Sequence, residues 1–320
     1  LLAVAHGAGA QDGDGELLEN PGGGGGPRGG ELNPYQEGDW IAEGTALLIR
    51  DFVSAKEAKE LKRSAYRLFK ADNGPKWQEA AFNTAFMQGE HAKKLLTQGI
   101  LDLEERITNL TGIPLHKDET LLMFTRHKPG ALPKGTFVRN VHHDKNFAER
   151  RTVTVILYLS SARSDADGGH TILPGLPRLE ADGAPAAAGD AGAGEVEPVP
   201  YLARAFEGAF LEGKRALSSG AMAGQPGQLW DKTALRLVEQ ECQLALEGRN
   251  NALAVRPKRG TALVIRHVLP DGRPNLRAWH TACHAADGAP RFTAQKFKEP
   301  VMGDALEDDS AAPGGSSEEL

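Results

Sequence analysis

Residues 151–160, Arg-Thr-Val-Thr-Val-Ile-Leu-Tyr-Leu-Ser, form the segment that most limits how this chain can fold. β-branched and apolar side chains dominate its middle and polar clusters flank it, which predicts a buried strand. Two later stretches, 167–174 and 252–265, combine Gly or Pro turns with further short strands. The chain is therefore predicted to contain a β-sheet core.

Helices are predicted ahead of these strands. Ser54 and Glu57 have the spacing of a capping box, in which each side chain bonds to the backbone N–H of the other residue. The apolar positions that follow keep helical spacing, and a second helix is predicted over about 91–110. Helices followed by strands favour an α+β or jelly-roll fold class.

Composition divides the chain into three parts. Residues 1–44 are Gly-rich and acidic, and residues 303–320 are acidic with no basic residue. Such segments bury too little apolar surface to fold, so we expect a disordered leader and a disordered tail. Residues 45–302 between them are predicted to form one domain.

A long insert, residues 175–250, interrupts this domain. Its first part, 180–200, is rich in Ala, Gly, Pro and acidic residues and is expected to be a loop or disordered. Helices are predicted around 203–217 and 233–246. Long loops on a rigid scaffold often carry function. We expect the insert to cover the mouth of a site, and a tolerated surface insertion is the alternative.

The sequence Val-His-His-Asp at 141–144 contains a His-x-Asp pair. Residues two apart in a strand point to the same side, so His142 and Asp144 can offer a nitrogen and an oxygen to one metal ion. His280 is a candidate third ligand from another strand. Two histidines and one carboxylate leave coordination positions open, as in non-haem Fe(II) oxygenases. The pair alone is a weak signal, because such residues commonly lie on a solvated loop.

Further motifs surround this pair in a fixed order between Thr45 and Val301. They are His142 to Asp144, Leu157-Tyr158-Leu159, Gly168 to Pro174, Arg256 to Gly260, His280 to Cys283, and Gly288 with Arg291. This order resembles the prolyl 4-hydroxylase group of the Fe(II)/2-oxoglutarate-dependent dioxygenases. The resemblance implies a double-stranded β-helix, or jelly roll, buttressed by N-terminal helices. It also implies an enzyme that hydroxylates a C–H bond, most often of a peptidyl proline, and releases succinate and carbon dioxide.

The resemblance gives roles to individual residues. His142, Asp144 and His280 would bind Fe(II), with 2-oxoglutarate and dioxygen as co-substrates and ascorbate as a further ligand. Arg291 would hold the distal carboxylate of 2-oxoglutarate, because a guanidinium meets a carboxylate with two parallel hydrogen bonds. His127 stands where the family carries a tyrosine that helps to bind 2-oxoglutarate, and it can still donate a hydrogen bond.

Two positions depart from the family pattern. The family places a lysine ten residues after the distal histidine, where this chain has Pro290. A one-residue slip in the turn restores the register for Arg291, and Lys296 is the second choice for this role. His170 occupies a position at which the family carries a glutamate, which leaves the details of co-substrate binding open.

Other residues near these motifs have simpler interpretations. His143 faces away from His142 in a strand and is expected to support the site or to lie at the surface. His284 is expected in a turn, and His267 has no constellation of ligands around it in the sequence. Trp279 is expected to pack in the core.

Three alternative functions stay open. One is an oxygenase of the same fold that acts on another side chain or on a nucleobase. The net charge of -6 becomes about +7 for residues 45–302 alone, which is too weak to argue for nucleic acid. A second is a catalytically silent binding module. The third is a zinc hydrolase, which would need a glutamate base beside the histidines, and this chain has no obvious glutamate there. The expected partner is a proline-rich polypeptide, whose extended form suits a groove, and the oligomeric state is not predicted.

The cysteines bear on the cellular compartment. Cys242 and Cys283 are the two cysteines of the chain, and the family resemblance implies that they can be joined. A disulfide fits an oxidising compartment. Residues 1–11 resemble the end of a signal peptide, with an Ala/Gly-rich leader as an equal alternative. No stretch reaches the roughly 18 apolar residues of a membrane span. We expect the endoplasmic reticulum or secretory pathway, with the cytoplasm as the alternative.

Overall fold

The computed structural model describes residues 40–42, 44–88, 94–116, 119–133, 136–137, 141–178, 198–218, 228–286, 288 and 290–300. All of them belong to one compact unit, residues 33–320. The predicted tail, all of the predicted leader before Trp40, and residues 180–197 of the low-complexity segment lie outside the described residues, so their disorder stays a prediction.

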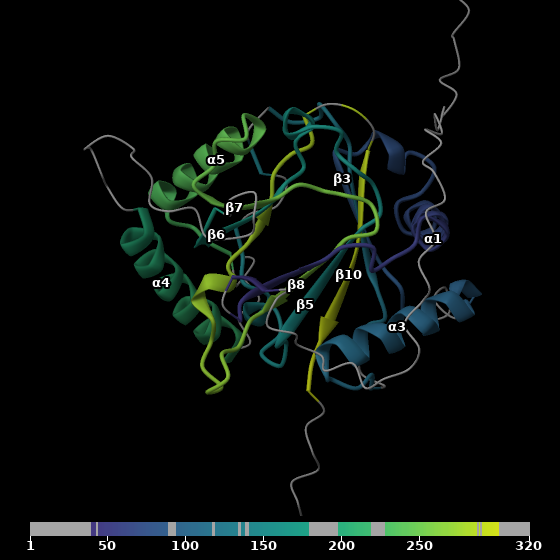
Figure 1. Cartoon of the computed structure of the whole chain (residues 1–320), viewed down its shortest axis with the longest axis horizontal. Coiled ribbons are helices and arrows are strands. Elements are labelled where there is room, and N and C mark those ends of the chain that lie inside the picture. Colours follow the sequence, from purple (N-terminus) through teal and green to yellow (C-terminus); the bar gives the residue numbers. More distant parts are fainter. Residues whose placement is uncertain are drawn as a thin grey trace, which may run out of the picture. The chain divides into compact units, whose positions relative to one another are not determined.

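Seven antiparallel strands form the larger sheet (Figure 1), in the order β1-β2-β8-β5-β10-β4-β3. β5 (Val153–Tyr158) is the buried strand predicted from residues 151–160, and all of its residues are buried. The other strands of this sheet are β1 (Trp40–Ala42), β2 (Ala46–Ile49), β3 (Phe82–Phe86), β4 (Met123–His127), β8 (Ala262–Arg266) and β10 (Arg291–Lys298).

A smaller antiparallel sheet faces the larger one. It contains β6 (Thr171–Pro177), β7 (Ala252–Val255) and β9 (Thr281–Ala282), in the order β7-β6-β9. Apolar side chains from both sheets pack together between them, including Ile156 and Leu263 from the larger sheet and Leu173 and Leu253 from the smaller one. The predicted combination of helices with antiparallel sheets is confirmed, and the double-stranded β-helix stays a prediction.

Two helices cover the other face of the larger sheet (Figure 1). α1 (Ala55–Asn73) begins with the predicted capping box, because Ser54 and Glu57 exchange both hydrogen bonds. α3 (Gln98–Thr111) begins later than the predicted helix over 91–110. Its N-cap, Thr97, has an extended backbone, and apolar spacing alone does not mark where a helix starts.

The connection between β6 and β7, residues 178–251, contains α4 (Pro198–Ser218) and α5 (Lys232–Leu246). Both predicted helices of the insert are thus confirmed, with α4 starting five residues earlier than expected. Figure 1 shows both helices beside the smaller sheet, away from α1 and α3. A disulfide joins Cys242 of α5 to Cys283, which follows β9. The pairing implied by the family resemblance is present.

Alternate residues of β10 face two different environments. Phe292 and Ala294 pack in the apolar cluster under the helices, while Arg291 and Thr293 face the smaller sheet and line a pocket there. Strand side chains alternate in this way because successive Cβ atoms point to opposite faces.

The next two residues on the helix side of β10 are lysines. Lys296 and Lys298 are fully buried and form ion pairs with Glu104 and Glu119 at 2.8 to 3.1 Å. A buried charge requires such compensation. We call these four residues the buried ion cluster.

The folded domain starts earlier than expected. β1 pairs with β2 through Trp40 and Ala42, so the sheet includes residues that precede the expected start at Thr45. No helix in the described parts of the chain has both the length and the apolar character needed to cross a membrane.

Candidate metal centre

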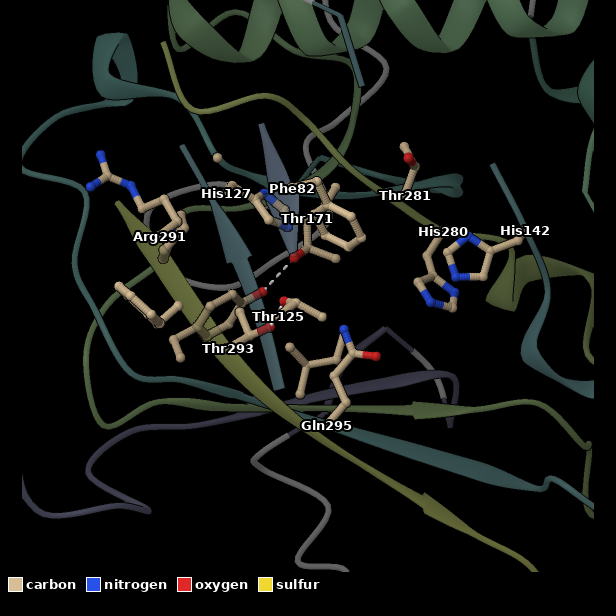
Figure 2. A pocket seen from close by; sticks show the side chains of 16 residues that line it. Phe82, Thr125, His127, His142, Thr171, His280, Thr281, Arg291, Thr293 and Gln295 are labelled. Carbon is tan, nitrogen blue, oxygen red and sulfur yellow. Dashed lines mark hydrogen bonds between the residues drawn. The ribbon is translucent and has the colours of Figure 1, made fainter. Parts of the chain in front are cut away.

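Three buried side chains bring metal-binding atoms together. Nε2 of His142 lies 3.6 Å from Oδ1 of Asp144, and Nε2 of His280 lies 3.7 Å from Oδ2 of the same carboxylate. One donor atom from each of the three residues falls within 4.8 Å of the others. Figure 2 shows the two imidazole rings close together at one side of a pocket. The predicted ligand set is therefore assembled at one point.

The backbone holds the two histidines face to face. The N–H of His142 donates to the carbonyl of His280 at 3.0 Å, and the N–H of His280 donates back at 2.9 Å. Residues paired in this way across antiparallel segments project their side chains to the same face. The pairing explains why residues so distant in sequence offer nitrogens to one place.

The backbone conformation that places Asp144 at the site differs from the predicted one. We expected His142 and Asp144 to share one face of a strand, but Asp144 begins a short 3-10 helix, Asp144–Asn146. The N–H of Phe147 donates to the carbonyl of Asp144 at 3.0 Å. Because the chain turns directly after His143, the carboxylate comes to lie between the two imidazoles.

A backbone carbonyl selects the tautomer of His280. Nδ1 of His280 lies 3.0 Å from the carbonyl oxygen of Ala278, which can only accept. Nδ1 therefore carries the proton, and Nε2 presents a lone pair toward Asp144. A hydrogen bond of this kind commonly orients a histidine that binds a metal.

Two polar residues hold Asp144. The hydroxyl of Thr154 donates to Oδ2 of Asp144 at 2.5 Å and lies 2.8 Å from Nε2 of His267. Because the hydroxyl proton is committed to the carboxylate, His267 must donate its Nε2 proton to the hydroxyl oxygen. Burial raises the pKa of Asp144, but the positive charge that His280 carries when both of its nitrogens are protonated, together with the hydrogen bond from His267, lowers it more, so that it lies well below its usual range. The interpretation of His267 as a residue without a constellation was wrong.

His143 lies in the interior behind the site. Its side chain is fully buried, with Nε2 3.1 Å from the carbonyl oxygen of Asn275. Burial and the neighbouring His267 hold its pKa well below the usual value, so the ring is neutral. The predicted surface location is therefore wrong, and support of the site stays a prediction. Trp279 packs in the core as predicted, stacked on Phe206 with the ring centroids 5.2 Å apart.

A pocket between the two sheets extends from the metal ligands to Arg291. His142 and His280 line one side of it and Arg291 the other, with His127 and Thr171 between them in Figure 2. Hydroxyl groups concentrate in its middle. The hydroxyl of Tyr158 donates to that of Thr171 at 2.7 Å, and those of Thr125 and Thr293 lie 2.5 Å apart.

These hydroxyl residues were not among those predicted for the site. The signal was nevertheless present for Thr293, because it lies two residues after Arg291 in a strand and must share its face. Thr125 and Tyr158 are the direct cross-strand neighbours of Thr293 on β4 and β5. Recognising them required the strand register, which the sequence alone does not provide.

Arg291 begins β10 and is 4% exposed. Its Nη2 lies 3.5 Å from Oδ2 of Asp167, and its methylene carbons pass beside Gly169, where an added Cβ would come within 3.1 Å of Cγ. In Figure 2 the guanidinium points away from the two histidines. Burial lowers the pKa of Arg291, while Asp167 opposes this change. Lys296, the second choice for the role of Arg291, is excluded from it because its side chain lies in the buried ion cluster on the opposite face of β10.

His127 ends β4 and pairs across the sheet with Arg291 and Phe82. Burial, together with the nearby His284 and Arg291, lowers the pKa of His127 to about 3, so the ring is neutral at physiological pH. Its Nδ1 atom is buried and has no hydrogen-bond partner among the described residues. A buried polar atom of this kind at a pocket wall is suited to meet a ligand.

Two further histidines have structural partners. His170 occupies the position of the family's glutamate, and its Nε2 lies 3.2 Å from Oδ1 of Asp165 instead of lining the pocket. Nε2 of His284 accepts a hydrogen bond from the backbone N–H of Leu132 at 3.0 Å. Neither ring is among the grouped metal-binding atoms.

Solved structures of prolyl 4-hydroxylases and of other 2-oxoglutarate and Fe(II) oxygenases are similar to this chain. The viral collagen prolyl hydroxylase of Paramecium bursaria Chlorella virus-1 is 13% identical, covers 88% of this chain and 98% of its own, and has a TM-score of 0.43. A prolyl-4-hydroxylase of Pseudomonas putida is 16% identical over 80% and 92%, with a TM-score of 0.37.

A third similar structure is EvdO2 of Micromonospora carbonacea var. aurantiaca, solved in complex with 2-oxoglutarate. It is 14% identical, covers 80% of this chain and 86% of its own, and has a TM-score of 0.39. No family model and no curated protein sequence matches the chain.

The donor set fits a divalent transition-metal ion. It offers two imidazole nitrogens and one carboxylate oxygen, all buried, with the carboxylate held by Thr154 and the His280 tautomer already selected. Imidazole and carboxylate ligands suit iron, and three protein ligands leave positions for other molecules. The site can therefore bind a metal that also contacts a small molecule in the adjoining pocket.

Proposed function

We propose that this chain is an Fe(II)- and 2-oxoglutarate-dependent dioxygenase that hydroxylates a C–H bond of a peptidyl proline. The observation that carries the proposal is the buried group of His142, Asp144 and His280 at one side of a pocket that contains Arg291 at the other. One oxygen atom of dioxygen enters the substrate C–H bond and the other enters succinate, as 2-oxoglutarate loses carbon dioxide. The bound iron supplies the activation of dioxygen.

The protein residues hold and orient these molecules. His142, Asp144 and His280 would bind the iron, and Arg291 would bind the distal carboxylate of 2-oxoglutarate. The neutral ring of His127 and the hydroxyl groups in the middle of the pocket offer hydrogen bonds to the co-substrate. The buried walls exclude water, which protects a reactive site from side reactions. Ascorbate would serve as the reductant that keeps the iron in its Fe(II) form.

The sequence motifs and the disulfide suggest a substrate class and a compartment. A proline-rich polypeptide is the proposed substrate, because the sequence motifs resemble prolyl 4-hydroxylases and an extended proline-rich segment suits a groove. The disulfide between Cys242 and Cys283 supports an oxidising compartment such as the endoplasmic reticulum. We also propose that the two facing sheets form the double-stranded β-helix of this family.

Succinate formation tests the proposal directly. The protein would be loaded with Fe(II) without oxygen, mixed with 2-oxoglutarate and exposed to air, with and without proline-rich peptides. We expect succinate to increase with peptide and to vanish in His142→Ala, while Asp271→Asn, which changes an exposed carboxylate in a surface turn, behaves as the wild type. Turnover without any peptide stimulation would indicate another substrate, such as a different side chain or a nucleobase. Absence of both iron and 2-oxoglutarate binding would reject the dioxygenase.

A further inference from the structure

The connection between β6 and β7 contributes a chain segment directly beside a metal ligand. Gln228 pairs with His142 in an antiparallel bridge, on the side of His142 opposite to His280. The N–H of Leu229 donates to the carbonyl of Val141 at 2.8 Å. Three segments therefore lie side by side. The segment with His142 is in the middle, and the segments with Gln228 and His280 lie on either side of it.

This pairing determines which way Gln228 points. Directly opposed residues of antiparallel segments project their side chains to the same face. His142 and His280 project toward the metal site, so Gln228 projects to that face as well. The bond from Leu229 to Val141 makes this a non-hydrogen-bonded pair, the type in which the Cα atoms approach to about 4.5 Å and the side chains are closer.

The residues next to Gln228, His142 and His280 point to the opposite face, as expected for extended segments. Val141, Leu229 and Trp279 each precede or follow one of the three, and all of them pack in one apolar cluster with α4 and α5. The segments thus have an apolar face toward the helices and a polar face that carries His142, His280 and Gln228. Gln228 is 6% exposed, so its amide lies in the interior and not in bulk solvent.

Gln228 also lies apart from the pocket proposed for 2-oxoglutarate. That pocket is lined by His142 and His280 but not by Gln228. Two residues further along, Trp230 is 60% exposed, the most exposed large apolar side chain among the described residues. Trp230 lies between Gln228, which is bridged to His142, and Asp231, the N-cap of α5, so the exposed indole belongs to the same short segment as Gln228. An amide beside the metal and an exposed indole next to it are suited to a peptide group and an apolar side chain.

We propose that Gln228 and Trp230 are substrate-positioning residues, with the Gln228 amide holding a backbone peptide group of the polypeptide substrate beside the metal and the Trp230 indole packing against a neighbouring proline ring. A primary amide can accept one hydrogen bond and donate another, which matches the two polar atoms of a peptide group. The inference rests on the proposed function for the identity of the substrate. It gives the connection between β6 and β7 a specific role in substrate choice.

The placement of Gln228 can be tested without any turnover. Gln228→Glu keeps the size of the side chain and adds a negative charge, so it should tighten Co(II) binding by about tenfold or more if the side chain faces the metal. Gln243→Glu adds the same charge on the exposed side of α5 and serves as the matched control. Equal Co(II) affinity in Gln228→Glu and the wild type would overturn the placement.

The substrate role is tested by binding of a synthetic polyproline peptide to the Co(II)-loaded protein with 2-oxoglutarate, without oxygen. Gln228→Ala and Trp230→Ala should each weaken peptide binding by about tenfold and leave 2-oxoglutarate binding unchanged, while Trp230→Phe should retain most of the affinity. Leu211→Ala removes another exposed apolar side chain, on α4, and should have no effect.

The outcomes separate this inference from the proposed function. Failure of the wild type to bind 2-oxoglutarate would reject the dioxygenase, while the Co(II) titration would still decide where Gln228 points. If the wild type binds 2-oxoglutarate and the peptide, and both alanine variants bind the peptide equally well, the substrate-positioning role alone is wrong. A loss of 2-oxoglutarate binding as large as the loss of peptide binding would also overturn it, because it would indicate general disruption of the site.

Discussion

The hydroxyl of Thr154 lies 2.5 Å from Oδ2 of Asp144, so a residue of the central strand β5 fixes the carboxylate of the candidate metal centre. The same hydroxyl accepts a hydrogen bond from His267 on the neighbouring chain segment. Asp144 itself lies in a short turn, where its side chain would otherwise have several orientations. The sheet therefore supplies the rigidity that the turn lacks.

Removing this hydroxyl should weaken metal binding. Thr154→Val keeps the shape of the side chain but takes away the donor to Asp144, and loss of such an outer hydrogen bond typically lowers metal affinity by about 10- to 100-fold. Thr154→Ser should restore most of the affinity, because it retains the hydroxyl. Titration with Co(II) measures both variants, and equal affinities for the valine and serine variants would contradict the role of the hydroxyl.

Arg291 should control the affinity for 2-oxoglutarate. Arg291→Met removes the charge that would meet the distal carboxylate, and we expect the KM for 2-oxoglutarate to rise by more than about tenfold, with a smaller rise for Arg291→Lys. Arg163→Met is the matched control, since Arg163 also pairs with Asp167 but is largely exposed. A rise in KM of the same size in the control would assign the effect to Asp167 instead.

His127 should make stability depend on pH. In the folded protein its pKa is about 3, whereas an unfolded histidine titrates near 6.5. At pH values between these two pKa values, the unfolded chain binds a proton at His127 that the folded chain does not bind. The stability contributed by the neutral ring is therefore complete above pH 6.5 and is lost as the pH falls toward 3. The free energy of unfolding of the wild type should therefore fall more steeply than that of His127→Gln when measured by urea denaturation between pH 7 and 5. Parallel curves would show that the ring is not kept neutral.

Lys296 should matter for stability and not for co-substrate binding. Lys296→Met leaves Glu104 and Glu119 buried without one of their partners, which should lower the free energy of unfolding by about 3–5 kcal/mol. Burial already raises the pKa of Glu104, so a lower pH should relieve part of the loss by protonating it. Adding Glu104→Gln should likewise recover stability. A changed KM for 2-oxoglutarate in a folded Lys296→Met protein would contradict the assignment of this lysine to the ion cluster.

The disulfide should stabilise the connection between β6 and β7. Its cysteines are 41 residues apart, and closing a loop of this length restricts the unfolded chain by about 4 kcal/mol. We expect a clear fall in Tm for Cys242→Ser with Cys283→Ser, and the same fall for the wild type after reduction. If reductant lowers the Tm of the double variant as well, the effect does not come from this bond.

The parts of the site that the sequence predicted depend on residue identity and order. The ligands His142, Asp144 and His280 were recognisable because few functions use those residue types in that order, and β5 was recognisable because its side chains are almost all apolar or β-branched. The capping box at Ser54 is equally local, since both of its hydrogen bonds lie within four residues.

The parts that escaped prediction depend on pairing between distant segments. His267 contacts Thr154 only because β8 and β5 lie side by side, and Gln228 meets His142 only because the connection between β6 and β7 returns to the metal site. No pattern within either segment carries that information. The turn that moves Asp144 out of the strand is likewise stabilised by tertiary contacts, which override local extended preference.

The two-sided character of β10 restricts how this protein can change in length during evolution. Arg291 and Lys296 lie on opposite faces, so inserting or deleting a single residue between them would either turn the lysines of the ion cluster into the pocket or turn Arg291 under the helices. A change of length in the segment before the strand does not alter which face each β10 side chain occupies. The one-residue slip that we expect between His280 and Arg291 would come before the strand and would leave both of its faces intact.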